Sequence, residues 1–566
     1  MMDPDALEKW FPRTRKPADN TFEIGLVLGG TVSAGAYTAG VLDYLIELLD
    51  AYEAKKASGE ASESHNVRLK IITGASGGGM CAAIFAAACR FRFPHIHADG
   101  DQAQWEKNPL YRTWVKDVTL ADMLQLGDAR GGVVSSMLNC VEIENIADRT
   151  VALDGLDPVE RPWLVDPLRV SLSMTDLDGV PYEVTFRNEY KGHQLNLHAD
   201  LIEFDVPTRV GQSVSESAPG VFPLASSASG SLVATEARSL LREAALGTGA
   251  FPIALKSRPL RNDIDAYRYR FATWAENEPK LHTAKPVLPG TSHPYWAVDG
   301  GTLNNEPYEH ARRFLAGLNG RNPRGGEEAN RAIILIDPLQ SFGEAATLRK
   351  PRPNLWDTGL QTLNALMGQS KFKQTDLALM QDKEVFSRFL IGPSREGEWV
   401  ADTAIASSGL GAFLGFVSEK YRHHDFMLGR RNAQWFFEAH FRLPAGNDTI
   451  DHTETGSSRI IPDYTGLPYK KELPQWPNRA KGNGPKDASK YEKALGLRLD
   501  YLSSIVRDLA VSKMVTKPWA RALAKAGVEL LWRVCLGGVA RRKILSVIND
   551  EINVVNRRSS SNPHGK

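Results

Sequence analysis

The chain has 566 residues, of which 42% are apolar, 8% aromatic and 24% charged, which excludes general disorder. Its 68 Lys and Arg residues balance 67 Asp and Glu residues, and this net charge of +1 excludes an overall electrostatic attraction to nucleic acid. Four dispersed cysteines without a CxxC pair exclude a disulfide framework and favour a reducing compartment.

Residues 1–20 are predicted to be an N-terminal extension. They carry acidic residues where a secretory signal would carry basic ones, and no apolar stretch of signal length follows them. The longest strongly apolar run, Met80 to Cys89, has ten residues, about half of the ~20 that a membrane-spanning helix needs. We therefore expect a cytoplasmic protein whose contact with membranes, if any, is peripheral.

Residues 21–340 show the pattern of an α/β domain. Apolar residues alternate through TFEIGLVLGG, a predicted strand that ends in Gly29 and Gly30 and precedes a long helical stretch. A second predicted strand, VRLKIIT, leads through GASGGG into the small-residue helix MCAAIFAAACRF. Two consecutive strand-to-helix units predict a parallel sheet with helices on its faces. Further apolar strands, among them YWAVDGG and RAIILID, extend this sheet to Asp337.

The rest of the chain is predicted to be mainly helical. Helical periodicity in residues 341–443 indicates an extension that packs on the α/β domain. Residues 444–489, rich in Pro, Gly and Asn, predict a linker. Helical periodicity returns over 490–558, a basic region, and residues 559–566 are predicted to be a frayed tail.

The strongest chemical signal is Gly74-Ala75-Ser76-Gly77-Gly78, which fits the G-x-S-x-G nucleophile elbow. It lies between a predicted strand and a predicted helix, where a tight turn of small residues would hold the Ser76 hydroxyl out at the edge of the sheet. The N–H groups at the start of the helix would then face the reacting carbonyl. The alternative is a glycine-rich turn that only packs the helix on the strand.

A serine needs a base to accept its proton as it attacks, and Asp299 is the best candidate. An apolar strand runs into Asp299, and Gly300 and Gly301 let the backbone turn immediately afterwards. A strand-end carboxylate faces the same edge of a parallel sheet as a strand-end serine. Taken alone, the pattern also fits an Asx turn in which Asp299 only caps its own loop.

Together these features resemble the patatin-like acyl hydrolases, whose pattern is a strand, a glycine-rich loop, the G-x-S-x-G elbow and a later D-G-G. Further stretches that carry the resemblance are the glycine loop and first helix at 29–42, a strand and turn at 174–179, SESAPGVFP at 215–223 and HDFMLGRRNAQWF at 424–436. The resemblance covers about residues 21–340, and 340–443 more weakly.

The resemblance implies a patatin-like three-layer fold and a serine acyl hydrolase that cleaves carboxylic esters of lipids through an acyl-enzyme, without cofactor or metal. It implies a dyad in which Ser76 is the nucleophile and Asp299 the direct general base. Because an unperturbed Asp has a pKa of ~3.9, burial has to make Asp299 a stronger base. The oxyanion site is expected to use backbone N–H groups from Gly29, Gly30, Thr31 and Gly77.

The glycine loop departs from the family pattern. The family's Gly-Gly-Gly-x-Arg/Lys-Gly corresponds here to Gly30-Thr31-Val32-Ser33-Ala34-Gly35, so two glycines and the basic residue are missing. No neighbour in the sequence replaces that positive charge. The departure leaves open a second function, a lipid-binding or scaffold protein that keeps the fold without turnover.

Two other interpretations involve histidines. A Ser-His-Asp hydrolase is an alternative because His310 follows Asp299 in a helical pattern. The alternating His and Asp side chains of residues 95–101 have a spacing that would suit metal ligands, although a polar loop is the simpler interpretation.

The segment from Lys513 to Arg558 concentrates positive charge, with ten Lys and Arg against three acidic residues, a net charge of +7. Pro518 suits the first position of a helix, whose apolar stripe would start at Trp519, with basic residues about 200° away. Such a helix fits the surface of an anionic membrane. An ordinary helix that packs its stripe on the core is the alternative.

Overall fold

The computed structural model describes most of the chain. The described residues are 8–10, 12–98, 100–128, 134–185, 192–272, 285–339, 368–371, 374–395, 401–468, 473–477, 487–514 and 537–560, with single residues 358, 362, 365, 485, 525, 526, 529 and 532.

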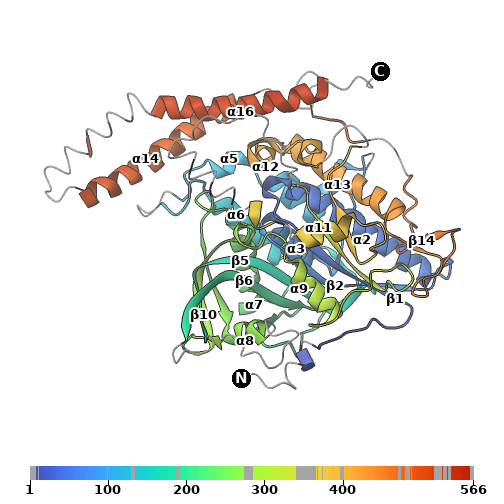
Figure 1. Ribbon diagram of the computed structural model, residues 1–566. Helices are drawn as coiled ribbons and strands as arrows, with labels where there is room; N and C mark the ends of the chain where they lie inside the picture. The colour runs from blue at the N-terminus through green and yellow to red at the C-terminus, as the bar shows by residue number, and fades with distance from the viewer. Residues whose placement is uncertain are drawn as a thin grey trace.

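A ten-stranded sheet runs through the centre of this described part of the chain (Figure 1). Its strands are β1 (Thr21–Leu28), β2 (Asn66–Gly74), β5 (Leu164–Val184), β6 (His193–Val206), β7 (Val221–Pro223), β8 (Arg258–Asp263), β9 (Lys285–Pro286), β10 (Ser292–Asp299), β11 (Arg331–Ile336) and β12 (Arg388–Ile391). The order is β12-β11-β1-β2-β5-β10-β8, with β6 and β9 paired to β5, and β7 to β6. Neighbours from β12 to β5 are parallel, whereas β10 and β8 continue the sheet antiparallel. The expected α/β fold with a mostly parallel central sheet is confirmed.

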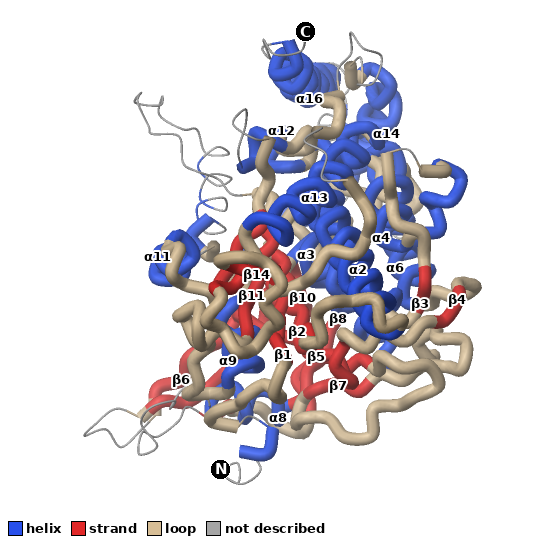
Figure 2. The backbone as a smooth tube through the Cα atoms, turned by 90° about the vertical axis from the view of Figure 1, so that its right-hand side faces the viewer, coloured by secondary structure: helices blue, strands red, loops and turns tan. Residues whose placement is uncertain are grey.

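Helices cover both faces of the sheet, which gives three layers (Figure 2). The helices are α2 (Gly35–Ala57), α3 (Ser76–Ala88), α4 (Pro109–Tyr111), α5 (Leu120–Met123), α6 (Val141–Val151), α7 (Glu236–Thr248), α8 (Ile264–Ala272), α9 (Tyr308–Ala316), α11 (Gln374–Gln381), α12 (Gly409–Ala412), α13 (Glu419–Ala439), α14 (Glu492–Met514) and α16 (Gly537–Ser560). Short helical turns are η1 (Val32–Ala34), η2 (Gln102–Lys107), η3 (Arg112–Asp117), η5 (Gly300–Thr302), η6 (Ala401–Ala404), η7 (Leu414–Val417) and η8 (Ser489–Tyr491). Strands β3 (Phe91–Arg92) and β4 (Asp157–Pro158) form one small sheet, and β13 (Arg442–Pro444) and β14 (Ser457–Arg459) another.

Strand β1 shows how the sequence pattern produces the layers. Successive side chains of a strand point to opposite faces of a sheet. The alternate residues Phe22, Ile24, Leu26 and Leu28 belong to the core under α2 and α3. Val27 instead packs in the smaller core under α9. Because both faces are covered, the strand is buried along its whole length.

Helix α2 is the central helix of the larger core, and α13 lies along it. The two backbones approach closely where each has a glycine: a β-carbon on Gly40 would overlap the Phe426 carbonyl, and one on Gly429 would overlap that of Tyr37. The helical stretch Val32–Ala57, which includes α2, is long and apolar enough, by length and composition alone, to cross a membrane, which the apolar runs in the sequence did not indicate. Its most apolar window is 89% buried inside the protein, and a buried core helix passes the same test.

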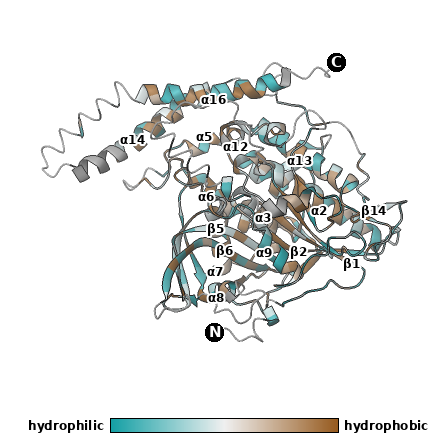
Figure 3. Cartoon of the chain, viewed as in Figure 1, coloured by the Kyte–Doolittle hydropathy of each residue, from teal (hydrophilic) through white to brown (hydrophobic). Residues whose placement is uncertain are grey.

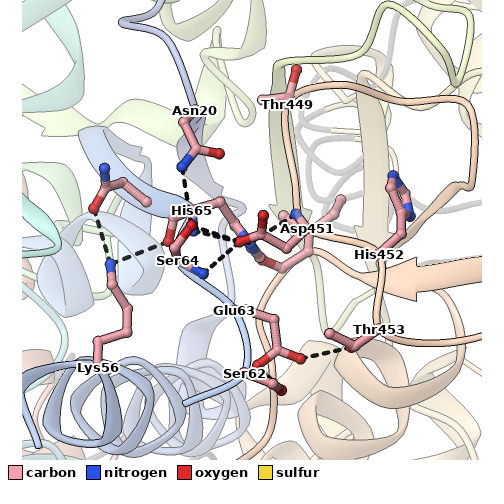
Figure 4. Close-up of polar contacts among 12 residues, drawn as sticks. Asn20, Lys56, Ser62, Glu63, Ser64, His65, Thr449, Asp451, His452 and Thr453 are labelled. Carbon is pink, nitrogen blue, oxygen red and sulfur yellow. Dashed lines mark hydrogen bonds and ion pairs between the residues drawn. The ribbon is translucent and has the colours of Figure 1, made fainter. Parts of the chain in front are cut away.

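The segment predicted as a linker at 444–489 is hydrogen-bonded to the turn that precedes β2 (Figure 4). The Asp451 carboxylate accepts hydrogen bonds from the backbone N–H groups of Ser64 and His65, the latter at 2.9 Å. The His65 imidazole contacts the Ile460 carbonyl through Nε2 at 3.0 Å and accepts the Asp451 N–H at Nδ1. Burial lowers the pKa of His65, which keeps the imidazole neutral and leaves Nδ1 able to accept. Ile460 itself is fully buried, so this segment contributes to the main core.

Helices α14 and α16 pack side by side at one end of the molecule, and α16 shows interleaved hydrophobic and hydrophilic residues (Figure 3). The apolar face of α16, which includes Leu545, Ile548 and Ile552, packs in a second core with Leu414 and Phe416 of η7. The amphipathic helix predicted from Pro518 lies outside the described residues, apart from residues 525, 526, 529 and 532.

Gly40→Ala should destabilise the protein. Alanine favours a helix interior by about 1 kcal/mol over glycine, but the overlap with the Phe426 carbonyl should cost more, for a net loss of about 1 to 3 kcal/mol. The midpoint of thermal unfolding should fall accordingly. Gly325→Ala, at a position where a β-carbon meets open space, is the matched control and should stay within about 0.5 kcal/mol of the parent. Equal midpoints for the two variants would contradict the close packing of α2 on α13.

Candidate active site

The turn between β2 and α3 holds Ser76 in strained backbone geometry. Strand β2 ends at Gly74 and α3 begins at Ser76, whose φ is +53°, in the left-handed region that side chains other than glycine rarely adopt. A β-carbon on Gly74 would come within 2.7 Å of the Gly79 nitrogen, and one on Gly78 would overlap the Leu28 carbonyl. The glycines of G-x-S-x-G are therefore required by close backbone packing around the serine.

Thr248 is a contributor to this turn that the sequence analysis did not identify. It is the fully buried last residue of α7, and its Oγ1 accepts a hydrogen bond from the Ser76 backbone N–H at 3.0 Å. This contact satisfies an N–H group that the strained turn leaves without a backbone acceptor in α3. No motif around Thr248 in the sequence signals the role, because the pairing depends on how α7 packs beside α3.

The structure brings Asp299 and Ser76 together. The Ser76 Oγ donates to Asp299 Oδ2 at 2.7 Å, and the Gly301 N–H donates to Asp299 Oδ1 at 2.7 Å. A β-carbon on Gly300 would overlap the Ser173 carbonyl, so the backbone after Asp299 needs that glycine to pass against β5.

The prediction that Asp299 meets Ser76 as two ends of parallel strands is wrong. Asp299 does not end a parallel strand, because β10 runs antiparallel to β5. The register explains the meeting instead: Gly74 of β2 pairs with Leu172 of β5, and Asp299 of β10 pairs with Met174. The ends of β2 and β10 thus arrive from opposite directions at nearly the same level of the long strand β5.

Burial makes Asp299 an unusually strong base for a carboxylate. Its side chain is 1% exposed, and this desolvation raises its pKa to about 7, against the opposing effects of the hydrogen bonds from Ser76 and Gly301. Near neutral pH a large fraction of Asp299 is therefore ionised, yet basic enough to accept the Ser76 proton.

The glycine loop lies against the elbow without the glycines of the family pattern. Val32 has a φ of +48°, so a β-branched residue occupies left-handed backbone where the family pattern has glycine. Ser33 holds the loop in place: its hydroxyl donates to the Ala412 carbonyl and accepts the Gly415 N–H at 3.1 Å. The segment around α12 therefore fixes this loop from outside.

The residues predicted for the oxyanion site differ in their availability. The Gly29 N–H donates to the Ile336 carbonyl at 3.0 Å, so this amide is already bonded and does not suit an oxyanion. A β-carbon on Gly30 would lie 3.3 Å from the Ser76 β-carbon, which places this backbone beside Ser76. Gly77 lies in the first turn of α3, where N–H groups have no acceptor within the helix, and Thr31 packs against it.

Ser76 and Asp299 open into a cavity of about 750 Å³. Its walls come mainly from α3, η3, α6, α7 and the segment around α12. The apolar side chains of the wall include Met80, Ile84, Trp114, Met123, Ile143, Ile146, Val151, Leu246, Phe251, Leu255, Leu410, Phe413 and Phe416. This size lies within the range of small-molecule pockets, and the lining favours a long apolar ligand.

The two histidine alternatives do not come together at this cavity. The His310 Nε2 lies 2.8 Å from Glu203 and 3.2 Å from the Ser171 hydroxyl, so it has other partners than Ser76 and Asp299.

In the segment considered for metal, His95 contacts Asp43 at 2.8 Å and His97 contacts Glu47 at 3.0 Å, both acids on α2, while Asp99 lies outside the described residues. Among the residues with described positions, no group of three or more His, Cys, Asp or Glu is arranged to hold a metal ion.

Comparisons with known proteins give one extensive sequence relative. No family model matches the chain. The uncharacterized protein y4iI of Sinorhizobium fredii (strain NBRC 101917 / NGR234) is 33% identical over an alignment of 487 residues, and the match covers 78% of this chain and 67% of the relative. The crystal structure of VipD from Legionella pneumophila matches with 12% identity and a TM-score of 0.21, covering 95% of this chain and 85% of that chain. Because that score is low, the fold rests on the topology described above.

The ionisation of Asp299 should control the reactivity of Ser76. The rate of labelling by a serine-directed fluorophosphonate should rise with pH and level off above about pH 7, because protonated Asp299 cannot accept the Ser76 proton. Below that value the rate should fall about tenfold per pH unit. Asp299→Asn should label slowly at every pH, and a rate that is flat from about pH 5 to about pH 9 in the parent would contradict this role of Asp299.

Proposed function

The chain belongs to the same protein family as y4iI of Sinorhizobium fredii, and we propose from the geometry of its site that it is a serine acyl hydrolase. The observation that carries the proposal is the 2.7 Å hydrogen bond from Ser76 to a buried Asp299 whose pKa is raised to about 7. The proposed substrates are carboxylic esters of lipids, and the reaction needs only these two side chains and a backbone oxyanion site.

The reaction proceeds through an acyl-enzyme. The Ser76 Oγ attacks the ester carbonyl carbon, and its proton passes to Asp299 Oδ2. The tetrahedral intermediate then breaks its bond to the alcohol oxygen, which takes the proton from Asp299. Water attacks the acyl-enzyme and gives a proton to Asp299, and the bond to Ser76 breaks as that proton returns to Oγ. The carboxylic acid leaves and the dyad is restored.

Backbone N–H groups stabilise the oxyanion of the intermediate. The N–H groups of Gly77, at the start of α3, and of the Gly30–Thr31 loop flank Ser76, and the positive end of the helix dipole favours the developing charge. Removal of one such donor typically costs about 2.7 to 4 kcal/mol in the barrier.

The apolar cavity supports an acyl chain as the group that binds beside Ser76. Met80 and Ala83 lie on α3 one and two turns beyond Ser76, and both line the cavity. An acyl chain that leaves Ser76 along this helix would stay in contact with apolar side chains, and its burial contributes about 0.8 kcal/mol per methylene.

The second candidate is a lipid-binding protein of the same fold without turnover. The observation in its favour is the Gly29 N–H, which is bonded to Ile336 and so reduces the donors available to an oxyanion. This alternative predicts neither phosphonate labelling of Ser76 nor release of a carboxylic acid from any ester.

Ser76→Ala and Asp299→Asn should each lower ester hydrolysis by about a thousandfold or more, because each removes one half of the proton-transfer pair. The measurement is kcat/KM on a butyrate ester, with thermal unfolding to show that both variants fold. His310→Ala is the matched control and should retain activity, since His310 contacts Glu203. Undiminished hydrolysis by both dyad variants would refute the proposal.

Ala83→Phe should shorten the acyl chain that the cavity accepts. Position 83 is seven residues after Ser76, about 10 Å along α3, and it lines the cavity. We expect kcat/KM for a palmitate ester to fall about tenfold or more relative to that for a butyrate ester. Ala83→Ser, which nearly keeps the side-chain volume, should leave the ratio unchanged. Equal losses on both esters in Ala83→Phe would place the acyl chain elsewhere.

A further inference from the structure

Lys371 supplies the positive charge of the cavity. Among the described residues that line it, only Asp299 and Lys371 carry side chains that are charged near neutral pH. The rest of the lining is apolar or uncharged, so a ligand in the cavity meets one carboxylate that acts as the base and one ammonium group that has no part in the proton transfer.

Lys371 is held close to the loop that carries Asp299. The hydroxyl of its neighbour Ser370 donates to the Gly301 carbonyl at 2.7 Å, and the Lys371 Nζ donates to the Leu339 carbonyl at 2.7 Å. These two contacts tie residues 370 and 371 to the turn after β10 and to the chain just beyond β11. The lysine therefore reaches the cavity from the side of Asp299.

The Lys371 ammonium group keeps capacity for a ligand. It has three N–H donors, of which the Leu339 carbonyl takes one. The nearby Asp337 is fully buried, with Oδ1 bound to the Leu339 N–H at 2.9 Å and Oδ2 without a hydrogen-bond partner among the described residues. Burial raises the pKa of Asp337, while the charge of Lys371 acts in the opposite direction.

We propose that Lys371 binds an anionic group on the alcohol part of the ester, and so selects substrates that carry a phosphate or a carboxylate there. Asp299 gives its proton to the departing alcohol oxygen, so the alcohol part lies on the side of Asp299, which is also the side of Lys371. A lysine ammonium serves as a compact charge for either anion. The inference rests on the proposed function and adds the substrate's charge and the residue that reads it.

The test compares three esters that share the hexanoyl chain and differ in the charge of the alcohol part. They are hexanoylglycerol, hexanoylglycerol phosphate and the hexanoyl ester of glycolate. In the parent protein, kcat/KM should be about tenfold or more higher for an anionic ester than for hexanoylglycerol, since a hydrogen bond to a charged group contributes more than one between neutral groups. The advantage should shrink as salt is added, because salt screens the attraction. Comparison of the phosphate with the carboxylate ester shows which anion the site prefers.

Lys371→Met should lower the ratio of kcat/KM for the anionic over the neutral ester about tenfold, mainly through a higher KM for the anionic ester. Lys371→Arg, which keeps the charge, should retain most of the ratio. Lys383→Met removes an exposed lysine outside the cavity lining and should leave the ratio unchanged. A merely structural role for Lys371 would lower the rates on all three esters alike and leave the ratio in place, which would overturn the proposal.

Measuring the binding of amphiphiles to an inactive variant tests the anion site independently of ester hydrolysis. In Ser76→Ala, dodecyl phosphate should bind about tenfold or more tightly than dodecanol by titration calorimetry, and Lys371→Met in the same background should remove the difference. If no ester is hydrolysed but this difference is found, the proposed reaction is wrong and the anion site stands. If esters are hydrolysed without any preference for charge and the two amphiphiles bind equally, the anion site is wrong and the hydrolase stands.

Discussion

The hydrogen bond between Ser76 and Asp299 is the interaction on which the rest of the site depends. In the proposed dyad no histidine lies between the two side chains, so the Asp299 carboxyl has to be desolvated enough to be basic and still able to carry a negative charge. Burial raises the pKa of Asp299 to about 7, while the hydrogen bonds from Ser76 and Gly301 prevent a further rise. A third donor would make the carboxylate a weaker base, and the loss of both donors would raise its pKa further.

The strained backbone at two positions near this hydrogen bond is stabilised by buried contacts. Ser76 and Val32 both have positive φ, a conformation that costs on the order of 1 to 3 kcal/mol for residues other than glycine. Thr248 holds the first by accepting the Ser76 N–H, and Ser33 holds the second through Ala412 and Gly415. The supporting residues come from α7 and from the segment around α12. The backbone geometry at Ser76 is thus maintained by packing between elements far apart in the chain.

Local patterns in the sequence were sufficient for the first strands and the elbow. Alternating apolar residues predict β1, and the glycines around Ser76 predict the turn because close backbone packing leaves no space for β-carbons there. The antiparallel direction of β10 could not be predicted, because an apolar strand reads the same in either direction. The burial of Ile460 could not be predicted either. Ile460 lies in a Pro- and Gly-rich segment, and its position depends on the contact between Asp451 and the turn at His65.

The positive charge at the cavity could not be predicted from the local sequence either. The glycine loop has no basic residue, and its sequence neighbours supply none, yet the fold brings Lys371 to the cavity from a segment more than three hundred residues away. This origin has a physical consequence. A cation in direct contact with Asp299 would lower its pKa and weaken the base. The Lys371 charge instead acts on Asp337, whereas the pKa of Asp299 responds to burial, Ser76 and Gly301. In the proposed reaction, a lysine in this position would attract an anionic ester into the cavity and leave Asp299 basic enough to take the Ser76 proton.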